Sequence, residues 1–282
     1  MMFFGTWEDA VKWLIEQPDQ EQLVRDCYYD QPLQAAAERY WKSDEWNAIR
    51  TFLPEKSGNV LDLGAGQGVS SFALAKDGWN VFALEPDDSK IVGTRAIQSL
   101  ADDISLSISV VQDKGESMPF LNESFDFVFA RQVLHHANNL RRLCGEVFRV
   151  LKPGGIFIAV RDHVISSRHD LPRFLEKHPL HKFYGGEHAF HLKEYLEALK
   201  SAGFVLKHVL RSFNSVINYA PYTEISLRKE FDFRLSRYPG GTFLSTLLAR
   251  KYAFHVFLKI LSLIDRRPGR LFSFVSYRPA NR

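Results

Sequence analysis

Residues 60–68 read Val-Leu-Asp-Leu-Gly-Ala-Gly-Gln-Gly, an apolar strand that runs directly into three alternating glycines. Gly64, Gly66 and Gly68 can adopt backbone dihedral angles that other residues avoid, and their missing side chains let a ligand approach the main chain. We therefore expect this loop to be a binding surface built from backbone. In the dinucleotide fingerprint G-x-G-x-x-G the third glycine stands one place later, where this chain has Val69.

Acidic residues accompany the loop on the first two predicted strands. Asp62 stands before the first glycine, and Glu85 ends the strand predicted over residues 81–85. With this pattern the chain resembles the class I S-adenosylmethionine (SAM) dependent methyltransferases.

Further segments that resemble this family follow in its usual order. They are the end of the third strand with its turn (112–120), the fourth strand (124–130), a Leu-His-His segment (134–136), and the helix and turn (146–155) that lead into the fifth strand (156–160). The similarity covers about residues 55 to 165, and the flanks hardly at all.

The resemblance implies that SAM is the cofactor. A carboxylate at Glu85 would accept hydrogen bonds from both ribose hydroxyls, and Asp62 would orient the glycine loop or the amino end of the methionyl group. The residues that we expect to bind the cofactor are Asp62, Gly64, Ala65, Gly66, Gly68, Glu85, Pro86, Asp113, Lys114, Gly115, Arg131 and, as a lid residue, Tyr40.

At the third strand the chain departs from the family. Lys114 occupies the position that usually holds the acid facing the adenine amine, and Asp113 lies one residue earlier. Either a one-residue bulge restores Asp113 to that role, or backbone and apolar contacts such as Met118 hold the adenine.

Histidines supply the candidate catalytic groups. SAM brings its own electrophile, so the protein mainly positions the acceptor and needs a base only if the acceptor loses a proton. His136 and His163 are the candidate bases, because histidine titrates near neutral pH. Asp162, His163, His188 and His191 also offer metal ligands, but their spacing matches no metal motif, so we expect no metal.

Composition limits the protein class. With 282 residues, 45% of them hydrophobic, and a net charge of +3, the chain predicts a packed globular protein and not a nucleic-acid binder. Cys27 and Cys144 are the only cysteines, which disfavours a disulfide framework and favours the cytoplasm. Residues 1–17 lack the long apolar run of a signal or spanning segment.

Strand and helix patterns alternate from residue 59 to 160, which predicts an α/β, Rossmann-like, doubly wound sheet of seven strands. Its ligand site would lie at the carboxyl ends of the strands, where Arg131 follows strand four and residues 161–163 follow strand five. The family's last strand is antiparallel, and residues 271–277 resemble it. We expect a helical cap (1–53), a SAM-binding core (54–211 plus 269–282) and a helical insertion (212–268).

Two segments outside the resemblance are candidates for acceptor binding. A loop of about 30 residues after strand five, long enough for a lid, holds six of the ten histidines. Residues 242–264 are apolar except for four basic residues, of which Lys251, His255 and Lys259 share one helical face. This segment would contact a membrane or a lipid-linked substrate, or else pack on its own domain or on a second copy in a homodimer.

We expect methyl transfer to a small-molecule acceptor, at the oxygen of a saccharide, polyketide or lipid-linked precursor. Oxygen is favoured because histidines surround the expected acceptor side, and because residues 131–134 lack the Asn/Asp-Pro-Pro-aromatic signature of many N-methyltransferases. The alternatives are a SAM-binding regulatory or assembly protein without catalysis, and an N- or C-methyltransferase. A nicotinamide oxidoreductase would require the later third glycine.

Overall fold

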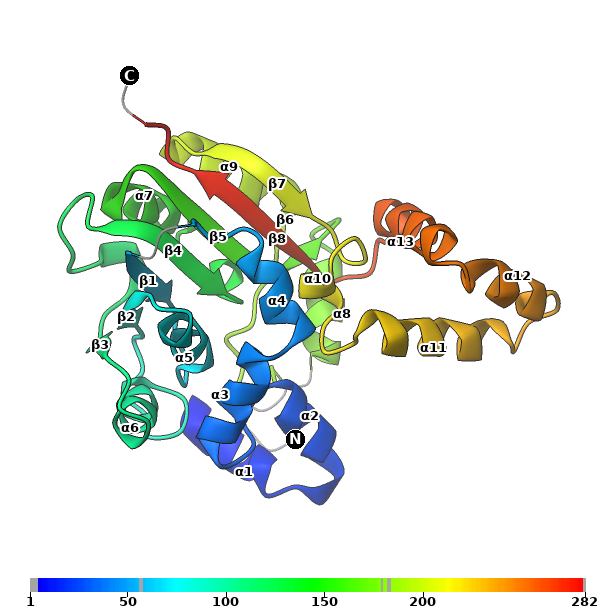
Figure 1. The fold of residues 1–282 in the computed structure, drawn as a ribbon, viewed down its shortest axis with the longest axis horizontal. Helices are drawn as coiled ribbons and strands as arrows, with labels where there is room; N and C mark the ends of the chain where they lie inside the picture. The colour runs from blue at the N-terminus through cyan, green and yellow to red at the C-terminus, as the bar shows by residue number, and fades with distance from the viewer. Residues whose placement is uncertain (1–4, 56–57, 179, 182–183, 281–282) are drawn as a thin grey trace.

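The computed structural model describes residues 5–55, 58–178, 180–181 and 184–280. One mixed sheet lies at its centre (Figure 1). Its strands are β1 (Asn59–Leu63), β2 (Asn80–Leu84), β3 (Ile108–Val111), β4 (Phe125–Arg131), β5 (Leu151–Ile165), β6 (Phe190–His191), β7 (Val205–Leu210) and β8 (Arg270–Tyr277). The order is β3-β2-β1-β4-β5-β8-β7, with β6 paired to β5 outside this path. Strand β8 runs antiparallel to both neighbours, which confirms the predicted Rossmann-like fold.

Helices cover both faces of the sheet, so the central strands are buried on both sides. One face packs against α3, α4, α5 and α6, and the other against α7 and α9. The helices of the body are α1 (Trp7–Ile15), α2 (Glu21–Asp26), α3 (Leu33–Trp41), α4 (Asp44–Arg50), α5 (Val69–Lys76), α6 (Thr94–Asp103), α7 (Leu140–Val150), α8 (Asp170–Lys177), α9 (Leu192–Ala202) and α10 (Val216–Tyr219), with 3-10 turns η1 (Pro18–Gln20), η2 (Gly115–Ser117) and η3 (Leu134–His136).

Strand β5 is longer than the sequence indicates. It continues to Ile165 because β8 resumes pairing after an irregularity, with Asp162 opposite Phe272 and His163 opposite Leu271. Residues 161–163 therefore lie within the strand and not in a loop after it, and Arg131 is likewise the last residue of β4.

The carboxylate of Asp77 helps to join the N-terminal helices to the body. Asp77, which caps the end of α5, accepts hydrogen bonds from the indole nitrogens of Trp41 and Trp46 at 2.7 and 2.8 Å. It also accepts two from Arg50, at 2.7 and 2.9 Å. Helices α3 and α4 are thus fixed to the sheet's first crossover helix.

A helical arm projects from one side of the sheet (Figure 1). It consists of α11 (Glu224–Leu235), α12 (Gly241–Leu248) and α13 (Lys251–Ile264). The apolar run at 242–264 is two helices and not one, because Arg250 has an extended backbone that lets α13 turn back onto α11. There the guanidinium of Arg228 lies 4.0 Å from the ring centre of Phe254. None of the helices in the described ranges combines the length and the apolar run that crossing a bilayer requires.

Replacing Asp77 by alanine should lower the free energy of unfolding by about 2–3 kcal/mol, because two indole donors and a guanidinium lose their shared acceptor. Urea denaturation followed by tryptophan fluorescence measures this loss. Asp103→Ala, at an exposed position on α6, is the control. Equal losses in the two variants would contradict the assigned role of Asp77.

Candidate functional site

The glycine loop joins β1 to α5 with all three glycines at positive φ, namely 63°, 56° and 91° in chain order. The amides of Gly64 and Ala65 donate to the Leu84 carbonyl at 2.8 and 3.2 Å, which ties the loop to the end of β2. A Cβ at Gly64 would lie 2.7 Å from the Val133 side chain, whereas one at Gly66 would meet nothing within 4 Å. The loop is therefore packed against protein at Gly64 and open at Gly66.

A cavity of about 670 Å³, a volume typical of small-molecule sites, lies at the carboxyl ends of β1, β2 and β4. The N-terminal helices and the segment before β6 complete its walls. The predicted cofactor residues that line it are Gly64, Ala65, Gly66, Glu85, Pro86, Asp113, Lys114, Gly115 and Arg131.

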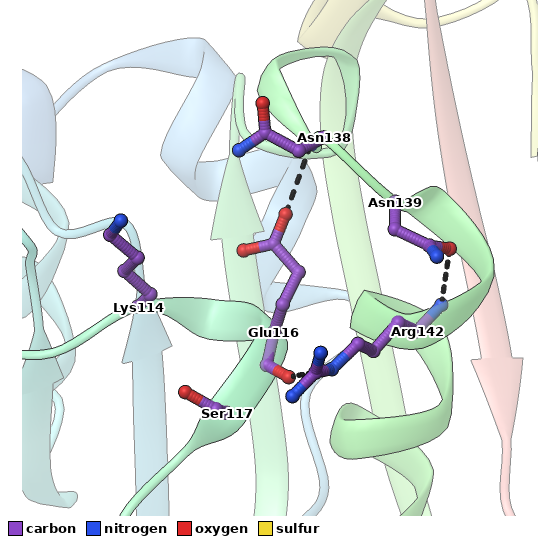
Figure 2. Close-up of a pocket in the computed structure, with 6 residues that line it drawn as sticks. All are labelled: Lys114, Glu116, Ser117, Asn138, Asn139 and Arg142. Carbon is purple, nitrogen blue, oxygen red and sulfur yellow. Dashed lines mark hydrogen bonds between the residues drawn. The ribbon is translucent and has the colours of Figure 1, made fainter.

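A recess of about 240 Å³ adjoins this cavity and shares Lys114, Glu116 and Asn138 with it. Figure 2 shows Glu116 between Asn138 and Arg142. The Asn138 amide donates to the Glu116 carboxylate at 3.0 Å, and Arg142 Nε donates to the Glu116 carbonyl at 2.7 Å. These bonds fix the turn after β3 to the start of α7, while the Lys114 side chain extends away from them.

Glu85 lies at the wall of the cavity, directly after β2. One carboxylate oxygen accepts the Gly66 amide at 2.8 Å and the other accepts the Asp87 amide at 3.1 Å. Burial raises the pKa of Glu85 to about 7, although these hydrogen bonds oppose the shift. The carboxylate thus connects the glycine loop to the second strand and still faces the cavity.

Two arginines of the cavity wall share one buried carboxylate. Arg131 donates to both oxygens of Glu45, at 2.8 and 3.2 Å, and Arg161 Nη1 lies 3.9 Å from the same group. Burial opposes charge on Glu45, but Arg131 and Arg161 hold its pKa below the usual value. The guanidinium of Arg131 also lies over the rings of Tyr28 and Tyr40. Two cations for one anion leave this wall positive.

His135 lies between two carboxylates at the cavity floor. Its Nδ1 is 2.9 Å from the Asp162 carboxylate, and its Nε2 is 3.5 Å from that of Glu187. Burial disfavours a charged ring, yet the bonds to Asp162 and Glu187 raise the pKa of His135 to about 9. Burial likewise disfavours charge on Glu187, but His135 lowers the pKa of that carboxyl to about 2.

Of the two predicted bases, His136 lines the cavity and His163 does not. His136 Nδ1 is 3.2 Å from the Gly186 carbonyl, which can only accept, so Nδ1 carries the hydrogen and Nε2 keeps its lone pair. Burial and the nearby His135 lower the pKa of His136. His163 lies beside His135, with ring centres 4.7 Å apart, because β5 continues past the cavity edge.

Comparison with known proteins agrees with this geometry. Residues 61–159 match the family model described as a methyltransferase domain. A sterol 24-C-methyltransferase of Yarrowia lipolytica is 28% identical over 242 residues, which cover 73% of this chain and 61% of that protein. An uncharacterised protein of Methanocaldococcus jannaschii is 31% identical over 163 residues, covering 57% of this chain and 70% of that one. The chain belongs to the class I SAM-dependent methyltransferases.

A solved structure shares the fold of this methyltransferase. Phosphoethanolamine N-methyltransferase 2 of Haemonchus contortus, determined with S-adenosylhomocysteine, has a TM-score of 0.57 and 18% identity, covering 99% of this chain and 61% of that one. The chain spans about three fifths of the length of the Yarrowia enzyme.

The cofactor of this methyltransferase is SAM, and the residues present fit it. The Glu85 carboxylate lines the cavity and would accept the two ribose hydroxyls, and the open space at Gly66 would admit a ligand against the main chain. The positive wall at Arg131 and Arg161 would suit the methionyl carboxylate. When bound, SAM supplies an electrophilic methyl group on sulfur.

Three predicted cofactor residues do not line the cavity. Tyr40 is fully buried, with its ring against Tyr28 and Trp46, because α3 packs on α5; it is not the lid residue that we expected. Asp62 is fully buried and accepts the Ser71 hydroxyl at 2.6 Å, so it fixes α5 to β1. Gly68 is the N-cap of α5.

Sequence reasoning missed several residues of the walls. Glu45 showed no signal, because its partner Arg131 is 86 residues away. For Glu187 the sequence held only a weak signal, which is the Tyr-Gly-Gly-Glu turn among the histidines of the loop. The cavity residues that were not predicted include Trp7, Leu23, Tyr29, His178, Leu180, Tyr184 and Glu187.

Affinity for S-adenosylhomocysteine should fall as the pH drops below about 7. In the free protein a buried Glu85 takes up a proton near that pH, whereas accepting both ribose hydroxyls requires the ionised form, so protonation competes with binding. The dissociation constant should rise by up to about tenfold per pH unit below 7 and level off above 8.

Calorimetry of wild type and Glu85→Gln from pH 5.5 to 8.5 measures this dependence. The variant should bind about 10- to 100-fold more weakly at pH 8 and lose most of the pH dependence. Glu55→Gln, at an exposed position, is the control. A wild-type affinity that stays constant from pH 5.5 to 8.5 would exclude this role for Glu85.

Proposed function

We propose that this chain transfers the methyl group of SAM to a hydroxyl oxygen of a small-molecule acceptor that has an apolar body. The observation that carries the proposal is His136, a ring that lines the cavity and has a lowered pKa. Its Nδ1 is engaged by the Gly186 carbonyl, and its Nε2 makes no hydrogen bond, with the Glu187 carboxylate 4.0 Å away. A neutral imidazole in that position can take the proton of an attacking hydroxyl.

The walls on the acceptor side combine polar and apolar groups. His135, His136, His178 and Glu187 form a polar floor. Apolar residues of the lining include Trp7, Leu23, Tyr29, Leu180 and Tyr184. Such a cavity suits an amphiphilic acceptor, such as a lipid-linked precursor or a polyketide, better than a free sugar.

The reaction is an in-line displacement. The acceptor oxygen forms a bond to the methyl carbon as the carbon–sulfur bond breaks, and S-adenosylhomocysteine leaves. The hydroxyl proton passes to His136 Nε2. Alignment of the two reactants supplies most of the rate, and the base adds about 10²- to 10⁴-fold.

Carbon methylation is the second candidate, because curated relatives of this chain are sterol 24-C-methyltransferases. An alkene acceptor would attack the methyl group and leave a carbocation, which must then lose a proton. The carboxylate of Glu187 or the ring of His136 could take that proton, so the linkage of the product has to be measured.

Incubation with ¹³C-methyl SAM and a panel of acceptors distinguishes these reactions. The panel contains a sterol with a side-chain double bond, a polyprenyl-linked sugar, a phenolic polyketide and phosphoethanolamine. We expect a methoxy signal in the product by ¹³C NMR. Methyl signals on carbon or nitrogen alone would overturn oxygen methylation.

The variant His136→Asn should lower kcat on the accepted substrate by about 10²- to 10³-fold, while affinity for S-adenosylhomocysteine stays within twofold. Because the pKa of His136 is lowered by burial and by the nearby His135, wild-type kcat should fall only when the pH drops below the range in which an ordinary histidine titrates, and the variant should not show this fall. His169→Asn, an exposed histidine at the start of α8, is the control. An unchanged kcat in His136→Asn would rule out His136 as the base.

We further propose that the helical arm α11–α13 docks on an anionic lipid surface that presents the acceptor. An exposed apolar stripe on α13 consists of Tyr252, Val256, Ile260 and Leu263, with Phe243 and Leu247 exposed on α12. Residues 233–264 contain five Arg and Lys residues and no acidic residue. Arg234 pairs with Glu230 at 2.6 Å, whereas Arg237, Arg250, Lys251 and Lys259 form no ion pair with any described residue. Apolar side chains beside such cations are the pattern of an interfacial helix.

The arm begins close to the cavity, which supports this assignment. Pro221 lines the cavity, and Arg161 donates to the Ala220 carbonyl at 2.9 Å, only a few residues before α11. An acceptor held at a lipid surface beside the arm would therefore be near the cavity wall.

The 282-residue chain should sediment with vesicles that contain phosphatidylglycerol and much less with vesicles of phosphatidylcholine alone. Ile260→Asp with Leu263→Asp should reduce binding at least tenfold. Leu121→Asp, 83% exposed at the turn before β4, should leave binding unchanged. If the double variant instead converts a dimer to a monomer in light scattering, the stripe is a contact between two copies.

A further inference from the structure

Three potential metal ligands converge at the cavity floor. His135, His163 and Glu187 each offer one ligand atom, and these atoms lie within 4.8 Å of one another. They come from η3, from β5 and from the segment before β6, so only the folded chain brings them together.

Both histidines have one ring nitrogen already engaged. His135 Nδ1 pairs with Asp162 at 2.9 Å, and His163 Nδ1 donates to the Gly269 carbonyl at 2.8 Å. A carboxylate or a backbone carbonyl at the far nitrogen is the usual second shell of metal-binding histidines. The hydrogen bond at Nδ1 leaves the lone pair on Nε2 of His163 directed toward the space beside Glu187. The same holds for Nε2 of His135 when that ring is neutral.

Several buried polar atoms at this place are incompletely satisfied. His163 Nε2 and Asp162 Oδ2 have no hydrogen-bond partner among the described residues, and Glu187 Oε2 has only the longer contacts of 3.5 Å to His135 Nε2 and 4.0 Å to His136 Nε2. Buried polar atoms are rarely left unsatisfied, since that costs free energy. A cation between His163 Nε2 and Glu187 Oε2 would satisfy both at once.

We propose that His135, His163 and Glu187 bind one divalent transition-metal ion of the zinc class. Ligand atoms of a tetrahedral zinc ion stand about 3.4 Å apart, and His135 Nε2 lies 3.5 Å from Glu187 Oε2. Two imidazoles and one carboxylate are a donor set that such ions favour. His178 Nδ1 accepts the His181 amide at 3.3 Å and lies 3.9 Å from Glu187 Oε1, so it makes no hydrogen bond to the carboxylate.

The site would be open toward the acceptor. His135 and Glu187 both line the cavity, so an ion bound there could reach a ligand in it. An acceptor oxygen bound to the ion would lose its proton more readily, and His136 stands next in the chain to receive that proton. This role of the ion in activating the acceptor depends on the proposed oxygen methylation, whereas binding of the ion to the protein does not.

Co²⁺ alone is the probe for the site. The tag-free 282-residue chain, dialysed against a chelator, should bind one Co²⁺ per chain with the visible absorption of a low-coordinate site, and Zn²⁺ should displace it. Glu187→Gln and His163→Gln should each weaken Co²⁺ binding at least tenfold, and Asp162→Asn about 10- to 100-fold. Circular dichroism and S-adenosylhomocysteine binding show which variants are folded.

His169→Gln and Glu176→Gln are the matched controls, because both residues are exposed on or beside α8 and lie outside the cluster. Absence of saturable Co²⁺ binding by the wild type, or wild-type affinity in a folded Glu187→Gln variant, would overturn the site. Acetohydroxamate, a small oxygen-donor ligand, should shift the Co²⁺ spectrum. If the spectrum does not shift, the bound ion cannot coordinate the acceptor oxygen, whatever result the methyltransferase assay gives.

Discussion

The Leu84 carbonyl, which accepts the amides of both Gly64 and Ala65, is the constraint on which the site depends. The parallel register that sets Leu63 beside Leu84 brings the ends of β1 and β2 to the same level. The loop must then turn through left-handed conformations, which explains the glycines. The same register places the Glu85 carboxylate next to the Gly66 amide, so one pairing of strands creates both the space for a cofactor and the group that faces it.

The chemistry of the cavity floor depends on the far edge of the sheet. Pairing of β5 with β8 sets His163 opposite Leu271. The carbonyl of Gly269, just before β8, then accepts a hydrogen bond from Nδ1 of the His163 ring. Tyr195 of α9 donates to the His163 backbone carbonyl at 2.8 Å and fixes the strand from the other face. A segment more than 100 residues later in the chain therefore orients a histidine that the sequence places just after the fifth strand.

The sequence predicted the parts of the molecule that depend on local pattern. Alternating strands and helices, the glycine spacing and Glu85 sufficed for the fold and the cofactor, because neighbouring parallel strands must end at one edge. It could not predict Glu45, whose partner Arg131 comes from another layer, nor that Tyr40 is core, since a lid tyrosine and a packed tyrosine share the same helical spacing. The length of β5 also escaped prediction, because polar residues 161–163 resemble a loop until β8 pairs with them.

The cavity wall and the helical arm are mechanically connected through Arg161. Its guanidinium donates to the carbonyls of Ile217 and Ala220, at 2.8 and 2.9 Å, and lies 3.9 Å from Glu45. Those carbonyls belong to α10 and the turn that leads into α11. Because Nη1 of Arg161 makes all three of these contacts, this one side chain joins the start of the arm to the charged wall of the cavity.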